Sequence, residues 1–342
     1  MEVIEFKNVL GQTCNYMTIS NILKHYGFDV PEEYVFLLLK SQYKKDMDIN
    51  IPFFSRNTFR KIGFELRDYQ FKDLNEFNTL VHKLTLSNVP IIANVNTKGL
   101  SYFPQNINGI EEHPHIVIIH GYKDQHVLLS DVYVPFYPPE CFTGWIEEVS
   151  IYNAISNSND PGKLFTLNMG DNVIINQYEI FESCFVEIIN TLIKENLQRK
   201  MEAEYNSQLC DKVEGCEAII SHITQDDMKS IARKTRTEWL SFEGPAQTRD
   251  FLVKILISVQ NYHTDYERYA KDMKVFYQRW NAMANALIKF TVIFNAKYFK
   301  YVNDLYLKLL EEETQYMKNL KNEVLNLVKN TTYKIAVMEV DE

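Results

Sequence analysis

The sequence has 342 residues, of which 46% are hydrophobic and 24% are charged, and these fractions are typical of a globular protein. A formal net charge of −9 argues against a nucleic-acid-binding protein, because no long segment is dominated by Lys and Arg. The first residues lack the charged and then apolar pattern of a secretory signal, and the longest apolar runs are too short to span a bilayer. We therefore expect neither a nucleic acid nor a membrane as a partner.

The five cysteines are an odd number at irregular spacing, and no two of them form a CxxC pair. This usage predicts reduced thiols in a cytoplasmic protein rather than a disulfide framework. Four of them, Cys141, Cys184, Cys210 and Cys216, are interpreted as packing residues.

Glycine and proline divide the chain. Nine of the eleven glycines and nine of the ten prolines lie in residues 1–170, and none follows Pro245. A long stretch without either residue predicts long helices joined by short polar turns. Since the length also exceeds the usual size of a single core, we expect two domains, 1–172 and 173–342.

The first domain mixes helices with strands. Helices come first and strands later, which is an α+β pattern and not alternating βαβ units. In chain order, the periodicity predicts helices at 14–26 and 32–40, a strand at 64–71, a helix at 73–86, and strands at 90–96, 115–122 and 127–134.

The second domain is predicted to be an all-α helical bundle over about 175–330. Its apolar stripe includes Phe251, Ile255, Val259 and Tyr262, which we interpret as core. The Glu311–Glu313 run is interpreted as a solvated helix face. Residues 334–340 have a strand-like pattern and could return to a sheet edge.

Cys14 occupies an unusual place, since it opens the first predicted helix instead of packing inside it. Unpaired backbone N–H groups and the positive end of the helix dipole favour the thiolate at such a position, and the thiolate is the nucleophilic form. A free Cys is usually a small buried hydrophobe, so the position alone does not identify a nucleophile.

A predicted hairpin downstream carries a histidine and an aspartate, His115 and Asp131, that could act together with Cys14. If Tyr122 pairs with His126 across a three-residue turn, Asp131 lies opposite Val117, on the face of the sheet that carries His115. Diagonal neighbours are roughly 7–8 Å apart at the backbone, which lets a carboxylate reach an imidazole. A one-residue change of register would turn Asp131 to the other face.

Cys14, His115 and Asp131 follow one another in the order used by papain-like cysteine enzymes. Cys14 would attack a carbonyl carbon, His115 would take and return the proton, and Asp131 would fix the imidazole tautomer. The backbone N–H of Cys14 and the side-chain amide of Gln12 would stabilise the oxyanion.

These motifs carry a family resemblance. The span Gly11–Gly27, followed by His115 with Gly121-Tyr122 and by Asp131, resembles the family 39 cysteine peptidase-like proteins. With the helical second half, the chain looks like a member of the butirosin biosynthesis protein H-like family. One departure is that the peptidases place the oxyanion Gln further ahead of the cysteine than Gln12 is here.

The resemblance implies a papain-like catalytic domain followed by a helical domain that binds the acceptor or the carrier protein. It also implies acyl transfer, in antibiotic-type biosynthesis, from an acyl or peptidyl carrier protein through Cys14 to a small-molecule amine. No cofactor of its own is expected, since the carrier protein supplies the phosphopantetheine. A thioesterase, a peptidase or a non-catalytic binding protein on the same fold are the alternatives.

The remaining candidates are histidines and a basic patch. His113 is a rival for the base, because it has the same strand parity as His115. A zinc site built from His113, His115 and His120 is disfavoured, because His120 has the opposite parity and no acidic ligand completes the site. Lys229, Arg233, Lys234 and Arg236 form a compact patch that is either a solvated helix face or a docking surface for an acidic carrier protein. The residues leave open whether the protein is a monomer or a homodimer.

Overall fold

A computed structural model describes residues 2–41, 56–104, 114–135, 138–171, 173, 175–209, 213–239 and 244–338. The chain forms two compact units, Met1–Gln177 and Tyr178–Glu342. The boundary expected from the glycine and proline usage, between residues 172 and 173, falls a few residues earlier. The predicted combination of helices with an antiparallel sheet, followed by a helical region, is confirmed.

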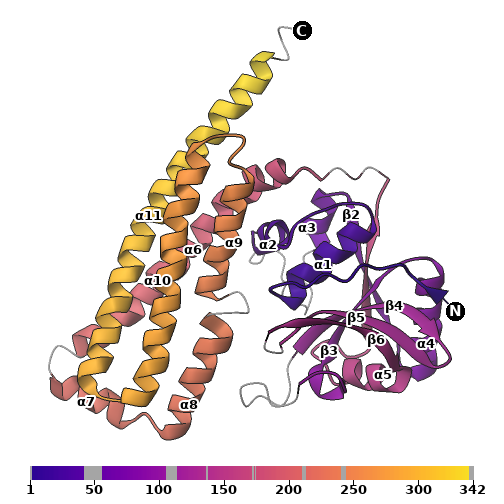
Figure 1. The fold of residues 1–342 in the computed structure, drawn as a ribbon, viewed down its shortest axis with the longest axis horizontal. Coiled ribbons are helices and arrows are strands. Elements are labelled where there is room, and N and C mark those ends of the chain that lie inside the picture. The colour runs from indigo at the N-terminus through magenta and orange to yellow at the C-terminus, as the bar shows by residue number, and fades with distance from the viewer. Residues whose placement is uncertain are drawn as a thin grey trace. The chain divides into compact units, whose positions relative to one another are not determined.

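The first unit contains a sheet and the helices that cover it (Figure 1). The three helices and four strands predicted for this unit agree with observed elements to within two residues at either end. In chain order the observed elements are β1 (Glu2–Val3), α1 (Cys14–His25), α2 (Glu32–Lys40), α3 (Arg56–Lys61), β2 (Phe64–Gln70), α4 (Leu74–Leu86), β3 (Ile91–Asn96), η1 (Thr97–Gly99), β4 (Pro114–Lys123), β5 (His126–Val134), β6 (Glu140–Glu147), α5 (Glu148–Ser156) and β7 (Lys163–Met169). Of these, β1, α3, η1, β6, α5 and β7 were not predicted.

The sheet has seven strands among the described residues, six of them in the order β2-β7-β3-β4-β5-β6, and β1 pairs with β4. Every pairing is antiparallel. Figure 1 shows α1 and α2 on one side of the sheet and α5 on the other. The sheet is therefore covered on both faces, and β4 and β5, which carry the candidate residues, run side by side near its middle.

One core cluster of this unit lies between the sheet and the helices α4 and α5, and the buried faces of α1 and α2 pack elsewhere in the unit. Alternate residues of β3 and β4, such as Val95, Val117 and Ile119, point into it and are fully buried. Val81 of α4 and Ile151 of α5 close it from the helical side. Burial of each such side chain stabilises the fold by roughly 1.5–3 kcal/mol, so this layer holds β4 and β5 firmly in register.

The second unit is helical, as predicted. None of the helices in the described residues has a stretch that is long and apolar enough to cross a membrane. The elements are α6 (Gln177–Leu209), whose first residue belongs to the first unit, α7 (Val213–Ser221), α8 (Gln225–Lys234), η2 (Thr235–Trp239), α9 (Pro245–Ser258), α10 (Asp265–Ile293) and α11 (Ala296–Met338).

A buried ion pair lies at the centre of the bundle. Arg249 of α9 donates to both carboxylate oxygens of Glu313 in α11, at 2.9 and 2.7 Å, and both side chains are almost fully buried. Asn196 Nδ2 and Trp280 Nε1 donate to the same carboxylate. Although burial opposes the charge, Arg249 and these donors hold the pKa of Glu313 below its usual value.

Three expectations about the second unit are wrong. Glu313 belongs to the core and not to the solvated face, because Arg249 compensates its charge. Tyr262 is about half exposed, since α9 ends at Ser258 before the apolar stripe reaches it. Residues 334–338 continue α11 as helix instead of forming a strand, because they extend an already nucleated helix. Residues 339 and 340 lie outside the described part of the chain.

Candidate active site

Cys14 is the first residue of α1, where the sequence places it. Thr13 caps the helix with an extended backbone, and its Oγ1 accepts a hydrogen bond from the Tyr16 N–H at 3.1 Å. The Cys14 side chain is buried, and its thiol donates a long hydrogen bond to Asn15 Oδ1 at 3.5 Å. As the first helical residue, Cys14 presents a backbone N–H that has no acceptor inside the helix.

A buried carboxylate fixes the loop that leads to Cys14. Glu32, the first residue of α2, accepts from the N–H of Gln12 at 2.8 Å and from the N–H and the hydroxyl of Thr13 at 2.7 and 2.8 Å. The backbone donors of Gln12 and Thr13 are therefore occupied. Of the backbone groups at this turn, the N–H of Cys14 is the one suited to hold an oxyanion.

The segment before Cys14 is tied to β5 next to Asp131. Asn8 Nδ2 donates to the backbone carbonyl of Asp131 at 3.0 Å, and the Gly11 N–H donates to the carbonyl of Val132 at 3.0 Å. These bonds join residues more than a hundred positions apart. They bring the start of α1 to the strand that carries the carboxylate.

His115 and Asp131 lie in contact in the buried interior. His115 Nε2 is 2.9 Å from each of the two carboxylate oxygens of Asp131, and both side chains are nearly inaccessible to solvent. Because an ionised carboxylate only accepts hydrogen bonds, Nε2 carries a hydrogen and donates. Nδ1 is then the ring nitrogen that can exchange a proton with Cys14.

The electrostatics of His115 favour its charged form. Burial lowers the pKa of the ring, but the nearby carboxylate of Asp131 and the interaction of the ring with Cys14 outweigh burial and raise the pKa of His115 to about 10. The ring therefore lies close enough to the thiol for the two to interact. A histidine that interacts with both a thiol and a carboxylate is placed as the base of a cysteine nucleophile requires.

Two further groups hold Asp131. The Tyr102 hydroxyl donates to Oδ2 at 2.9 Å, and the Tyr133 N–H donates to Oδ1 at 3.0 Å. Burial, reinforced by the charge of Asp131, raises the pKa of Tyr102 well above its usual value. Burial also raises the pKa of Tyr133, and the charges of Cys14 and Glu32 add to this shift.

The hairpin reaches the expected register by a different route. Its turn has two residues, Asp124 and Gln125, both with positive φ, and Lys123 pairs with His126. This turn alone would put Asp131 on the wrong face. A β-bulge at His120 shifts the pairing, so that Ile118 pairs with Ser130 and the next step brings Asp131 opposite Val117.

His120, among the described residues, lies apart from this group. His120 contacts the Ile4 carbonyl through Nδ1 at 3.2 Å and Ser130 Oγ through Nε2 at 2.9 Å, on the opposite face of β5 from Asp131. His113 lies outside the described residues. Within the described residues, no group of three or more His, Cys, Asp or Glu side chains is placed to hold a metal ion.

The basic patch lies in the second unit, on α8 and η2. Within α8, no described side chain is buried, and Lys229 pairs with Asp226 at 3.0 Å while remaining largely exposed. Arg233 is half-buried, whereas Lys234 and Arg236 are exposed. The patch thus lies on the surface of α8 and of the η2 turn that follows it.

The sequence did not point to Tyr102, Tyr133, Asn8 or Glu32. Tyr102 lies in a segment without helical or strand periodicity, and Glu32 looked like an ordinary acidic residue in the first turn of a helix. Comparison with models of known protein families gave no match, and a search of curated proteins found no similar sequence.

Proposed function

We propose that the protein is a cysteine-dependent acyltransferase whose first unit is a papain-like catalytic domain. The observation that carries this proposal is the contact of His115 with Asp131 on one side and its interaction with Cys14 on the other. Nucleophile, base and orienting carboxylate are recognised by such geometry rather than by sequence position.

The first half-reaction would load the enzyme. The Cys14 thiolate attacks the carbonyl carbon of an acyl thioester on a carrier protein, and the Cys14 N–H stabilises the oxyanion, with the Gln12 amide as a second donor. The intermediate collapses as the carbon–sulfur bond to the carrier breaks. His115 gives its Nδ1 proton to the departing carrier thiol, which leaves an acyl group on Cys14.

The second half-reaction would transfer the acyl group. A small-molecule amine attacks the acyl carbon, and His115 takes the proton that the amine loses. Collapse of this intermediate forms the amide and releases the Cys14 thiolate beside a protonated ring. The exchange of thioester for amide is downhill, so the reaction requires no nucleotide. The amine acceptor and the antibiotic-type pathway rest on the family resemblance.

The site requires reduced cysteines, which a cytoplasmic location would provide. Cys14, Cys141, Cys184 and Cys216 are free thiols. We further propose that Lys229, Arg233, Lys234 and Arg236 dock the acidic carrier protein. Reversing the charges of Lys229 and Lys234 should raise the KM for the carrier-bound donor without altering transfer from a carrier-free thioester, because the charge steers only the carrier.

Intact-mass spectrometry tests the proposal directly. Incubation with acyl-loaded carrier proteins, or with acyl thioesters of N-acetylcysteamine, should add one acyl mass to the protein. Cys14→Ala should abolish the adduct, whereas Cys184→Ser, which alters a free thiol in α6 of the second unit, should keep it. Absence of an adduct with every donor, together with iodoacetamide alkylation of Cys14 no faster below pH 7 than that of a free thiol, would rule the proposal out.

The same site could pass the acyl group to water, which would make the protein a thioesterase or a peptidase. Product analysis separates these outcomes, since hydrolysis yields the free acid and transfer yields the amide. Release of free acid at the same rate with and without an amine would assign the hydrolase.

A further inference from the structure

Glu32 is a buried carboxylate that contacts the turn before Cys14. It is the first residue of α2 and only 8% exposed, and its two oxygens accept three hydrogen bonds from that turn. Removal of a charge from water is unfavourable unless hydrogen bonds compensate it. The bonds from the turn provide this compensation, so the positions of Glu32 and of the turn depend on each other.

The hydrogen bonds at the start of α1 determine how the Cys14 N–H is presented. The first backbone N–H groups of a helix have no acceptor within the helix. Thr13 donates both its N–H and its hydroxyl to Glu32, and Thr13 Oγ1 in turn accepts from the Tyr16 N–H. The Cys14 N–H lies between these groups. Glu32 therefore holds Thr13 by its backbone and by its side chain, and thereby sets the direction of the next N–H, which is that of Cys14.

The beginning of the same turn is constrained as well. The Gly11 N–H donates to the Val132 carbonyl at 3.0 Å. A Cβ at Gly11 would collide with the side chain of Met17, so the turn packs directly on α1. Together with the bonds to Glu32, every backbone N–H from residue 11 to 13 thus donates to another element. The turn is anchored to β5 at its start and to α2 at its end.

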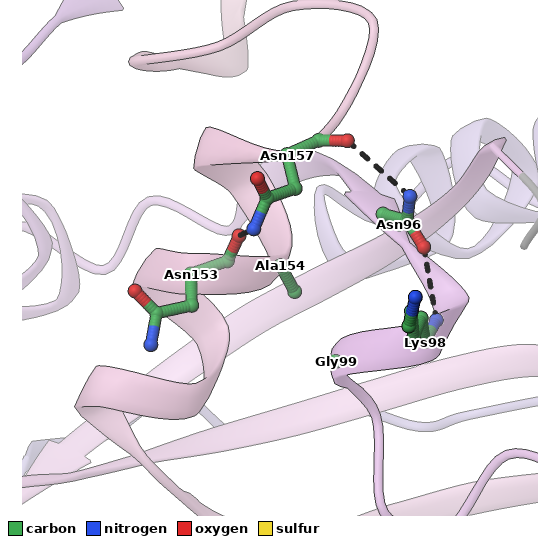
Figure 2. A pocket seen from close by; sticks show the side chains of 6 residues that line it. All are labelled: Asn96, Lys98, Gly99, Asn153, Ala154 and Asn157. Carbon is green, nitrogen blue, oxygen red and sulfur yellow. Dashed lines mark hydrogen bonds between the residues drawn. The ribbon is translucent and has the colours of Figure 1, made fainter.

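The base of the candidate site is supported by different contacts. Asn96 Nδ2 donates to the Asn157 carbonyl at 3.3 Å, and Asn96 Oδ1 accepts from the Lys98 N–H at 3.0 Å, at the edge of a small pocket (Figure 2). These bonds fix η1, from which the chain continues to Tyr102 and its bond to the carboxylate that orients the base. A change at Glu32 should therefore leave the base in place.

We infer that Glu32 is a positioning residue that directs the Cys14 N–H toward the oxyanion formed during acylation of Cys14. This inference deepens the proposed function and rests on it. Attack of the thiolate forms a carbon–sulfur bond and moves the π electrons of the carbonyl onto its oxygen, where the N–H stabilises the new charge. Collapse restores the carbonyl and expels the leaving group. The thiolate does not depend on Glu32, because a carboxylate bonded to the adjacent residue disfavours a second negative charge.

Two reagents separate the oxyanion from the thiolate. Iodoacetamide reacts at a saturated carbon, so its rate reports the thiolate and involves no oxyanion. p-Nitrophenyl acetate acylates the sulfur through a tetrahedral oxyanion. In Glu32→Gln one carboxylate oxygen becomes an NH₂ group, which cannot accept from the turn. We expect this variant to acylate Cys14 at least about tenfold more slowly than the native chain, and to alkylate it at an equal or higher rate. Mass spectrometry of peptides assigns each adduct to Cys14.

Glu33→Gln is the matched control, because it removes the same charge from the same first turn of α2 and should keep both rates. Equal acylation rates in the two variants would overturn the inference and leave the acyltransferase proposal intact. Loss of both rates in Glu32→Gln would also overturn it, since that result would assign Glu32 to the support of the thiolate or the fold.

Circular dichroism identifies a variant that does not fold. In that case Glu32→Asp, which keeps the charge but is one methylene too short to reach the turn, replaces Glu32→Gln with the same expected result. Selective loss of acylation by p-nitrophenyl acetate, combined with no transfer from any carrier-bound thioester in the native chain, would support the role of Glu32 and contradict the proposed acyl transfer. The two proposals can therefore fail separately.

Discussion

The Tyr102 hydroxyl donates a hydrogen bond to Asp131 Oδ2 at 2.9 Å, while its ring stacks on Phe142 with the centroids 3.7 Å apart. The Asp131 carboxylate thus accepts hydrogen bonds from the His115 ring and from the buried Tyr102 hydroxyl. This arrangement makes Tyr102 a positioning residue, since it acts on His115 through the carboxylate.

Removal of the Tyr102 hydroxyl should disturb the candidate site more than the fold. We expect Tyr102→Phe to lower the alkylation rate of Cys14 at neutral pH by about tenfold, because a hydrogen bond to a charged group contributes roughly 1.5–3 kcal/mol. The matched control is Tyr122→Phe, which loses a bond to the Glu148 carboxylate at 2.8 Å near the turn of the hairpin. Equal rates in the two variants would show that Tyr102 does not position Asp131.

Asp131→Asn should invert the hydrogen bonding of His115. The Tyr133 N–H can only donate, so the new amide would place its oxygen there and turn its NH₂ toward Nε2. Nε2 would then have to accept, the ring hydrogen would move to Nδ1, and the ring could no longer take a proton from Cys14. We expect turnover to fall by on the order of 10²–10⁴ with little change in KM, measured with thioester donors. A change in KM alone would argue against this role.

His115 should link the stability of the fold to pH. Its pKa is raised from 6.5 to about 10, so the folded state holds the proton more tightly than the unfolded state. The stabilisation is complete below about pH 6.5 and is lost as the pH rises toward 10. We expect the unfolding free energy of the native chain, measured with denaturant, to exceed that of His115→Asn at low pH by up to a few kcal/mol. This difference should shrink as the pH rises through the range. A difference between them that does not depend on pH would refute the linkage.

Removal of one partner of the Arg249–Glu313 ion pair should lower the unfolding free energy more than replacement of both partners by apolar residues. Arg249→Met leaves the Glu313 carboxylate buried without a counter-charge, and we expect a loss of about 3–5 kcal/mol of unfolding free energy. The double variant Arg249→Met with Glu313→Leu should recover most of this loss. The fluorescence of Trp280, which contacts both groups, reports the transition. A double variant as unstable as the single one would show that the pair itself, and not its desolvation, stabilises the bundle.

The sequence predicts three helices and four strands of the first unit, because their periodicities are strong and their ends carry clear signals, whereas α3, β6, α5 and β7 were not predicted. Thr13 caps α1, Gly27 follows it with a φ of 92°, and the apolar residues of β3 and β4 form short continuous runs, as strands buried on both faces do. The pairing of His115 with Asp131 was predicted from an incorrect turn. The bulge at His120 cannot be recognised in the continuous apolar run of β4, so it was missed, and its effect on the register cancelled that of the incorrect turn.

The parts that could not be predicted depend on contacts between distant segments. Glu313 looks like its neighbours Glu311 and Glu312, and only the position of Arg249 on another helix makes it a core residue. Tyr102 and Glu32 were missed for the same reason, since their partners lie in other elements. Propensity decides local structure, whereas these residues are defined by tertiary packing.

The hydrogen bonds from Asn8 and Gly11 to β5 also determine at which stage of folding Cys14 becomes part of the candidate active site. They close loops of more than a hundred residues, which form late because the chain must first lose the entropy of closing them. A polypeptide whose fifth strand has not yet docked would carry Cys14 as an unremarkable sulfhydryl. The enhanced reactivity of Cys14 would therefore appear only when the sheet is complete. A nascent or partly unfolded molecule would have an ordinary thiol and no catalytic activity.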